Sequence, residues 1–134
     1  MIKIFYLIIC LNKYINLKLN YLKFLKSLKK DLKQSNSVFK TVKFFRKDIV
    51  SVWIWFCVLE RYYNNNNNNI ESIISEIPKE YASRPTIFKI IDDATSKKYF
   101  EKILDNNDKR KYNLFPTSQT IKELEEWAKI FKGF

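Results

Sequence analysis

The sequence predicts a mainly α-helical protein with one small β-hairpin, and three observations lead to this expectation. A long apolar segment, residues 48–63, has the length of a buried helix. Two shorter helical patterns follow, residues 70–77 and about 83–97, and Pro78 ends the first of them. Two short strands around a polar tip then occupy about residues 99–116. This order of elements is that of a winged helix-turn-helix.

Length and charge divide the chain into two parts. Its 134 residues suffice for one domain with a core, and a hydrophobic share of 46% is typical of a globular protein. We expect residues 1–47 to form a basic helical segment and residues 48–134 to form the winged helix-turn-helix domain. The first 50 residues hold 12 Lys and Arg against two acidic residues, whereas the remainder is nearly neutral. Such a basic excess suits nucleic acid or an anionic membrane surface as a partner.

The N-terminal segment is expected to contain a helix over residues 14–34, followed by a break at the polar residues 34–37. Its apolar face would be formed by Leu17, Tyr21, Leu25, Leu28 and Leu32. This face would pack on its own domain or on a second subunit; a membrane-surface helix, further phosphate contacts or a poorly ordered extension are alternatives. The apolar run at residues 1–10 is too short for a signal peptide or a spanning helix, so we expect a cytoplasmic protein.

Residues 48–63 supply the supporting helix of the predicted domain. Their β-branched and aromatic content also fits a buried strand, but their length and their place in the order of elements favour a helix. Trp53 and Trp55 are expected in the core or in a subunit interface rather than in a ligand site. The six asparagines of residues 64–69 then predict a flexible loop without a functional role.

The second short helix carries the candidate DNA contacts. Ser83 is its expected N-cap, with the hydroxyl accepting a backbone N–H, and Pro85 suits the first turn. An apolar stripe at helical spacing would face the core: Ile87, Ile90, Ile91 and Ala94. Arg84, Thr86 and Lys89 lie off this stripe near the N-terminal end, where a helix in the major groove meets base edges. The alternative is an ordinary amphipathic helix with solvated charges.

The tip of the predicted hairpin reads D-N-N-D-K-R. Its basic residues, Lys109, Arg110 and the following Lys111, could place positive charge against phosphates or in a narrow minor groove. A nearby carboxylate can hold an arginine in one orientation through charge-assisted hydrogen bonds. The hairpin is therefore a candidate wing.

The last predicted helix covers residues 118–132. Its apolar face consists of Ile121, Leu124, Trp127, Ala128 and Phe131. Glutamates lie near its start and lysines near its end, which complements the helix dipole. Such a face packs internally or against a partner.

Several of these residues together resemble the MarR family of winged-helix regulators. The matching positions are Ser83, Pro85, Thr86, Asp105, Asp108, Arg110 and Thr117, within a resemblance that runs from about Asp48 to the C-terminus. The resemblance implies a dimer, built with the first and last helices, that places the recognition helix in the major groove. It also implies that Arg110 is the minor-groove arginine of the wing and that Asp108 orients it. Where the family usually has a glycine before the first wing strand, this chain has Ser96-Lys97-Lys98.

The sequence offers little for catalysis. It contains no histidine, which excludes Ser–His and Cys–His pairs and the commonest metal ligand. Cys10 and Cys57 have no metal-binding spacing, and a disulfide is not expected in the cytoplasm. The single glycine, Gly133, leaves no glycine-rich phosphate loop. We therefore predict no catalytic residue, no metal and no cofactor.

Together these patterns predict a cytoplasmic, homodimeric transcriptional regulator that binds double-stranded DNA. The expected contact residues are Ser83, Arg84, Thr86, Lys89, Lys109, Arg110 and Lys111, with Asp108 orienting the wing. One alternative is a winged-helix module that binds proteins. The other is a membrane-surface protein anchored by its basic N-terminal helix.

Overall fold

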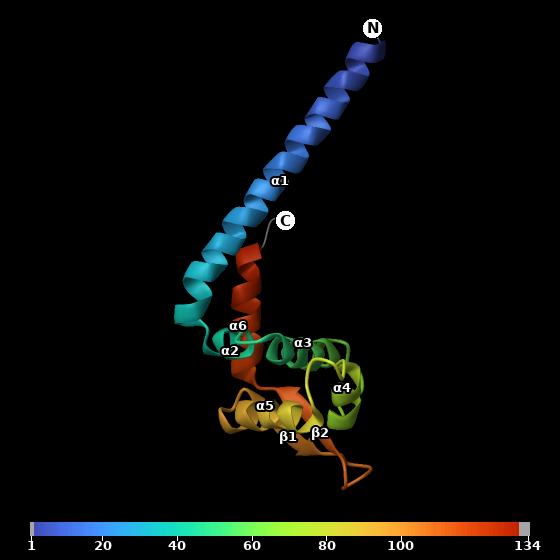
Figure 1. Cartoon of the computed structure of the whole chain (residues 1–134), viewed down its shortest axis with the longest axis vertical. Helices are drawn as coiled ribbons and strands as arrows, with labels where there is room; N and C mark the ends of the chain where they lie inside the picture. The colour runs from blue at the N-terminus through green and yellow to red at the C-terminus, as the bar shows by residue number, and fades with distance from the viewer. Residues whose placement is uncertain (1, 132–134) are drawn as a thin grey trace.

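The computed structural model describes residues 2–131, apart from the side chains of residues 34–37. Its elements are α1 (Ile2–Val38), α2 (Lys40–Phe45), α3 (Ile49–Tyr63), α4 (Ile70–Glu76), α5 (Arg84–Ser96), β1 (Phe100–Leu104), β2 (Tyr112–Pro116), α6 (Ser118–Ala128) and the 3-10 turn η1 (Lys129–Phe131). Figure 1 shows α1 extending away from a body formed by α2 to α5 and the hairpin. The predicted fold class, mainly α with a β-hairpin, is confirmed. Among the described helices, none has both the length and the apolar content needed to cross a bilayer.

The supporting segment is a helix rather than a strand. α3 begins after Asp48, whose carboxylate accepts a hydrogen bond from the Ser51 backbone N–H at 2.7 Å. At the other end Asn65 has a left-handed backbone, with φ of 49°. The following amide, Asn66 N–H, bonds to the Arg61 carbonyl at 3.0 Å, which closes a Schellman motif. Asparagine tolerates the left-handed conformation better than most residues. The first residues of the asparagine run therefore terminate α3.

The six asparagines of residues 64–69 form a defined connection, and the expectation of a flexible loop is wrong. The Asn69 side-chain oxygen accepts hydrogen bonds from two amides in the first turn of α4, at 2.9 and 3.3 Å. Asn69 also forms a β-bridge with Asn113, and the Leu114 N–H bonds to the Asn68 carbonyl at 2.9 Å. Composition was misleading here because asparagine side chains replace backbone partners at turns and caps.

Replacing Asn69 by alanine is expected to lower the free energy of unfolding by about 1 kcal/mol, because α4 loses its side-chain cap. Urea unfolding followed by circular dichroism measures this change. Asn64→Ala is the matched control, since Asn64 is exposed and no side-chain cap depends on it; its effect should stay within about 0.5 kcal/mol. Equal losses in the two variants would contradict the capping role.

The candidate recognition helix ends in a second Schellman motif. The Tyr99 N–H bonds to the Ala94 carbonyl at 2.8 Å, and the Lys98 N–H bonds to the Thr95 carbonyl at 3.0 Å. Lys98 occupies the left-handed position of this motif, with φ of 62°, where glycine is the usual residue. The chain then enters β1, which pairs antiparallel with β2 from Phe100↔Pro116 to Leu104↔Tyr112.

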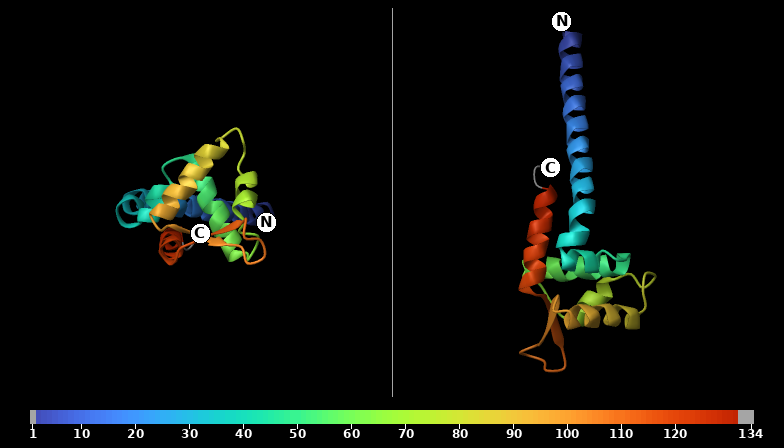
Figure 2. Two further views of the ribbon diagram at one scale, coloured as in Figure 1. Left: turned by 90° about the horizontal axis from the view of Figure 1, so that it is seen from below. Right: turned by 90° about the vertical axis from the view of Figure 1, so that its left-hand side faces the viewer.

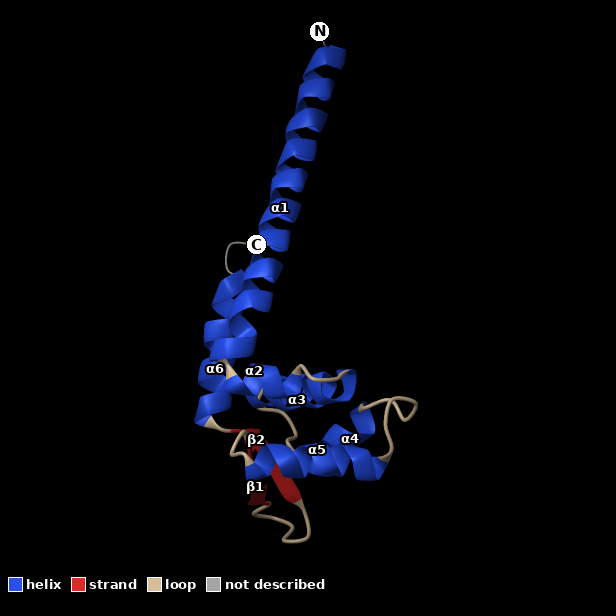
Figure 3. Ribbon diagram, turned by 60° about the vertical axis from the view of Figure 1, so that its left-hand side comes forward, coloured by secondary structure: helices blue, strands red, loops and turns tan. Residues whose placement is uncertain are grey.

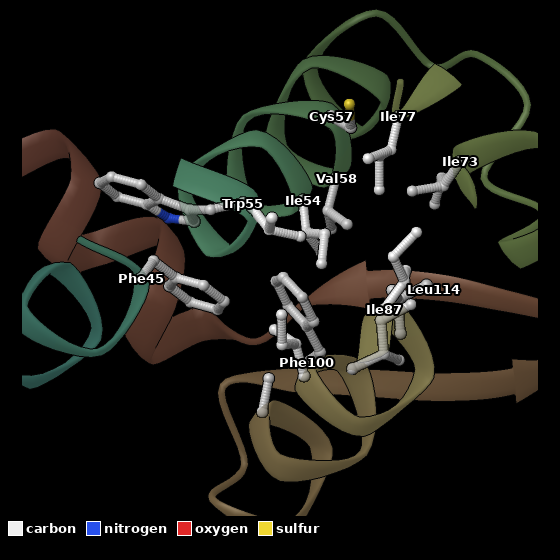
Figure 4. Packing of buried hydrophobic residues seen from close by; sticks show 14 of the residues in the cluster. Phe45, Ile54, Trp55, Cys57, Val58, Ile73, Ile77, Ile87, Phe100 and Leu114 are labelled. Atoms are coloured by element: carbon white, nitrogen blue, oxygen red, sulfur yellow. The ribbon is translucent and has the colours of Figure 1, made fainter. Parts of the chain in front are cut away.

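Buried side chains from α2 to α5 and from both strands form one core (Figure 4). The Phe45 ring stacks on Trp55, with centroids 5.6 Å apart and planes 5° apart, and on Phe100 at 4.9 Å. The predicted core position of Trp55 is confirmed, as is the buried stripe of α5: Ile87, Ile90, Ile91 and Ala94. Phe45 belongs to the first 47 residues, so both expected parts of the chain contribute to this core.

The predicted break at residues 34–37 is wrong, because α1 continues to Val38. The segment contains neither glycine nor proline, so its backbone has no strong helix breaker. The chain turns instead at Phe39, where φ is −105° and ψ is 97°. Phe39 packs against the core, which places the turn two residues after the polar segment.

Asp31 joins the lower part of α1 to the body. Its side chain is buried, and it accepts hydrogen bonds from Arg46 Nη1 at 2.9 and 2.8 Å. Trp127 Nε1 donates to the same carboxylate at 2.5 Å, so α1, α2 and α6 meet at one acidic side chain. Figure 3 shows α6 beside the lower part of α1. The last helix gives way to η1 after Ala128, earlier than predicted, and Lys132 lies outside the described residues.

Candidate nucleic-acid interface

The two candidate binding elements lie at the end of the molecule opposite the free end of α1. In Figure 1, α5 and the hairpin occupy the bottom of the body, and the hairpin tip extends below α5. Seen from below in Figure 2, α5 and the strands lie next to each other, and α5 contacts β1. Residues of the helix and residues of the tip can therefore face a single extended partner.

The start of α5 leaves its first amides without a side-chain cap. Ser83 takes the N-cap position with an extended backbone, as predicted. The predicted hydrogen bond from a backbone N–H to the Ser83 hydroxyl is wrong, because Ser83 Oγ lies instead 3.0 Å from Thr86 Oγ1. The two exposed hydroxyls thus flank the positive end of the helix dipole, a position that favours an anion.

Arg84 is held by two neighbours. Its guanidinium forms an ion pair with Glu71 of α4 and lies over the Phe88 ring, 5.0 Å from the centroid. The hydrogen bond between the two side chains lowers the pKa of Glu71 and raises the pKa of Arg84. Both side chains are more than half exposed, so water screens this pair. Lys89, one turn further along α5, is exposed and forms no ion pair with any described residue.

Asp108 organises the tip of the hairpin. Its Oδ1 accepts hydrogen bonds from the Arg110 backbone N–H at 3.1 Å and from Arg110 Nε at 3.3 Å. The backbone bond, followed by the side-chain bond, lowers the pKa of Asp108. Only one edge of the guanidinium is engaged, and the Arg110 side chain is 91% exposed. Lys109 and Lys111 are exposed on the same tip, so three cations are presented together.

Two contacts that the sequence analysis missed attach the wing to α5. Lys102 of β1 forms an ion pair with Asp92 of α5, with Nζ and Oδ1 2.7 Å apart. Thr117 Oγ1, just after β2, donates to the Lys98 carbonyl at 2.8 Å. Both join residues that are far apart in sequence and follow no local pattern, and only the MarR resemblance singled out Thr117. They fix the direction of the hairpin relative to the helix.

The remaining reactive groups are few. Burial, followed by a hydrogen bond to Glu76, raises the pKa of the Cys57 thiol to about 12, so the nucleophilic thiolate is disfavoured at neutral pH. Within residues 2–131, no three His, Cys, Asp or Glu side chains are arranged to hold a metal ion.

Solved structures of MepR from S. aureus share this arrangement of helices and wing. MepR in a complex with DNA aligns with 78% of this chain and 69% of its own, at 18% identity and a TM-score of 0.54. MepR bound to ethidium bromide aligns with 89% of this chain and 74% of its own, at 17% identity and a TM-score of 0.55. A MepR point mutant bound to an oligodeoxyribonucleotide aligns with 90% of this chain and 75% of its own, at 16% identity and a TM-score of 0.51. The chain has the MarR-type winged-helix fold.

In the MarR-type fold, α5 takes the place of the recognition helix and β1 with β2 that of the wing. The likeness is one of fold, since fewer than one residue in five is identical. No family model and no curated protein matches the sequence.

Proposed function

We propose that this protein is a sequence-specific transcriptional regulator that binds double-stranded DNA in the cytoplasm as a homodimer. The observation that carries the proposal is that the exposed, basic tip around Arg110 and the uncapped start of α5 lie at the same end of the molecule. Its fold is shared with MepR, a protein solved in a complex with DNA. We infer no enzymatic activity.

In the proposed complex α5 enters the major groove, whose width of about 12 Å admits a helix. Thr86 and Lys89 then face base edges, and Ser83 faces a phosphate next to the N-terminus of the helix. Arg84 reaches DNA only by exchanging Glu71 for a base edge or a phosphate. An exposed ion pair of this kind contributes less than about 1 kcal/mol, so DNA can displace it at low cost.

The wing extends the contact beyond the major groove. Asp108 holds Arg110 by its Nε edge, and the outer nitrogens of the guanidinium can enter a narrow minor groove, where the negative potential is enhanced. Lys109 and Lys111 lie beside it and face the phosphates on either side. Helix and wing together cover adjacent grooves of one duplex.

The proposed dimer covers apolar surface on α1 that the body leaves exposed. Large apolar side chains along its free part are exposed by between 42 and 75%, among them Ile4, Phe5, Leu7 and Leu11. An apolar surface of this extent on a water-soluble chain indicates a partner, and we propose a second copy. Sedimentation at twice the 16.2 kDa mass of one chain would support it.

The experiment that tests the proposed function is the salt dependence of binding to duplex DNA by the wild type and by Arg110→Ala. Each phosphate neutralised contributes about −0.9 to the slope of log affinity against log salt. We expect the wild type to bind in a salt-sensitive manner, and the variant to lose about 1–3 kcal/mol of binding free energy. The slope for the variant should be less steep by up to about 0.9, which is the contribution of one phosphate contact.

Lys129→Ala is the matched control, because Lys129 is exposed on η1, far from the wing, and its removal lowers the net charge equally. Its slope should equal that of the wild type. If folded wild-type protein does not bind duplex DNA at low salt, the proposal is wrong, and the fold serves protein recognition instead.

A further inference from the structure

A second basic surface lies at the C-terminal end of α5, away from the residues assigned above. It consists of Lys47, which follows α2, and of Lys97 and Lys98, which follow α5; we name these three residues the Phe44 lysine cluster. Lys47 Nζ lies 4.0 Å from the centroid of the Phe44 ring, and Lys97 Nζ lies 5.9 Å from the same centroid. Two segments some 50 residues apart thus bring their ammonium groups to one aromatic side chain.

The aromatic side chain is itself fixed. The Phe44 ring makes edge contacts with Phe45, at 4.9 Å between centroids, and with Tyr99, at 5.4 Å. Phe45 is fully buried, so Phe44 rests on the core rather than on solvent. A cation over a fixed ring is attracted to the ring face and loses rotamer freedom before any partner arrives. Lysines that are ordered in advance bind an anion with less entropic cost than mobile ones.

The cluster has no ion-pair partner among the described residues. Asp48 follows Lys47 in the chain, but its carboxylate caps α3. Lys47 and Lys97, whose ammonium groups approach the same ring, repel each other, and an anion from outside the chain would relieve this repulsion.

Lys98 lies where the chain leaves α5. Its φ of 62° places it in the left-handed region, which costs an ordinary residue about 1 kcal/mol relative to glycine. This conformation closes the Schellman motif that ends α5, and it places a lysine where glycine is usual. The same residue is anchored through its carbonyl by Thr117 Oγ1, so its backbone position is well determined.

We propose that the Phe44 lysine cluster binds the phosphate backbone of duplex DNA at the C-terminal end of α5, near the base of the wing. The inference rests on the proposed function and adds a second phosphate-binding surface to it. The 13 residues of α5 span about 20 Å between Arg84 and the cluster, somewhat more than the width of the groove. A helix lying in the groove has a phosphate strand on each side, and the cluster lies beyond the end of α5 at which no other contact was assigned.

The test measures the salt dependence of binding to duplex DNA for the double variant Lys47→Gln, Lys97→Gln. Two lost phosphate contacts should reduce the steepness of the log–log slope by about 1.8. The control double variant is Lys13→Gln, Lys18→Gln, which removes the same charge from the exposed, distant part of α1. Its slope should equal that of the wild type, after sedimentation has shown that both variants keep the wild-type oligomeric state.

Lys98→Gly separates binding from stability. Glycine fits the left-handed position, so the thermal unfolding midpoint should rise by a few degrees while the affinity for DNA at 0.1 M salt falls several-fold. A variant that is less stable and also binds less would show a structural role for Lys98 and would overturn its assignment.

The outcomes distinguish this inference from the proposed function. If Arg110→Ala flattens the slope and the Lys47, Lys97 variant does not, the cluster is not a phosphate site, and the proposed function stands. If the wild type binds no duplex at low salt, both proposals are wrong. If both sets of variants flatten the slope, the DNA contact extends along the whole of α5.

Discussion

Trp55→Ala should lower the free energy of unfolding by about 3–5 kcal/mol, a substantial part of the total stability of a domain of this size. Trp55 is fully buried, and its ring contacts Phe45 at 5.6 Å and Trp127 at 5.5 Å between centroids. Alanine would leave a cavity between α2, α3 and α6, and the surrounding helices could only partly collapse into it. Urea unfolding followed by far-ultraviolet circular dichroism measures the loss without depending on tryptophan fluorescence.

A second variant at the same position, Trp55→Phe, should be compared with Trp55→Ala. The indole N–H of Trp55 is buried and has no hydrogen-bond partner among the described residues. Phenylalanine retains most of the ring and removes this unsatisfied donor, so its cost should be well below that of alanine. Phe56→Ala is the control on the neighbouring residue, since Phe56 is 48% exposed. A loss in Trp55→Ala no larger than in Phe56→Ala would contradict the packing described for the core.

Asp31→Ala should destabilise the protein by about 3 kcal/mol, because it leaves the Arg46 guanidinium without its counter-charge and the partly buried Trp127 indole without its acceptor. The Asp31 side chain is 4% exposed and that of Arg46 is 30% exposed, which places the expected value at the lower end for a buried ion pair. A double-mutant cycle with Arg46→Met tests the cause. When both partners are replaced, the loss should be smaller than the sum of the two single losses.

Asp92→Ala provides the comparison for an exposed pair. Asp92 bonds to Lys102 at a similar distance, 2.7 Å, but its side chain is 60% exposed. Its loss should stay below about 1 kcal/mol. Equal effects of Asp31→Ala and Asp92→Ala, measured in the same urea experiment, would show that the Asp31 junction does not hold α1 to the body.

Local patterns in the sequence were enough to predict the elements of the winged-helix domain. The stripe of α5, the position of α4 and the hairpin follow from spacing over a few residues, where periodicity and turn chemistry act directly. Turn chemistry predicted the basic tip, but the choice of Asp108 as the partner of Arg110 came from the MarR resemblance, and the structure shows that contact. Their roles toward DNA stay predictions.

Contacts between distant residues could not be predicted in this way. Asp31 and Trp127 are 96 positions apart, and nothing in their neighbourhoods indicates a partner. The ion pair of Arg84 with Glu71 depends on the angle between α4 and α5, which the sequence pattern does not specify. The prediction of a flexible loop at residues 64–69 was wrong for another reason. The composition of this segment indicates disorder, whereas the helix caps that it forms depend on the helices on either side.

The contacts of Asp31 also determine how far α1 extends from the body. Between Ile2 and Asp31, α1 extends about 44 Å as a straight arm at 1.5 Å per residue. If two copies pair along these arms, the angle set by Asp31, Arg46 and Trp127 determines how far apart the two α5 helices lie. Successive major grooves on one face of DNA are about 34 Å apart. A tilt of about five degrees moves the end of such an arm by about 4 Å. In the proposed complex, that tilt would change how well the two α5 helices match the spacing of the grooves. The buried Asp31 carboxylate would then help to set the distance between the two α5 helices so that it matches the helical repeat of the DNA.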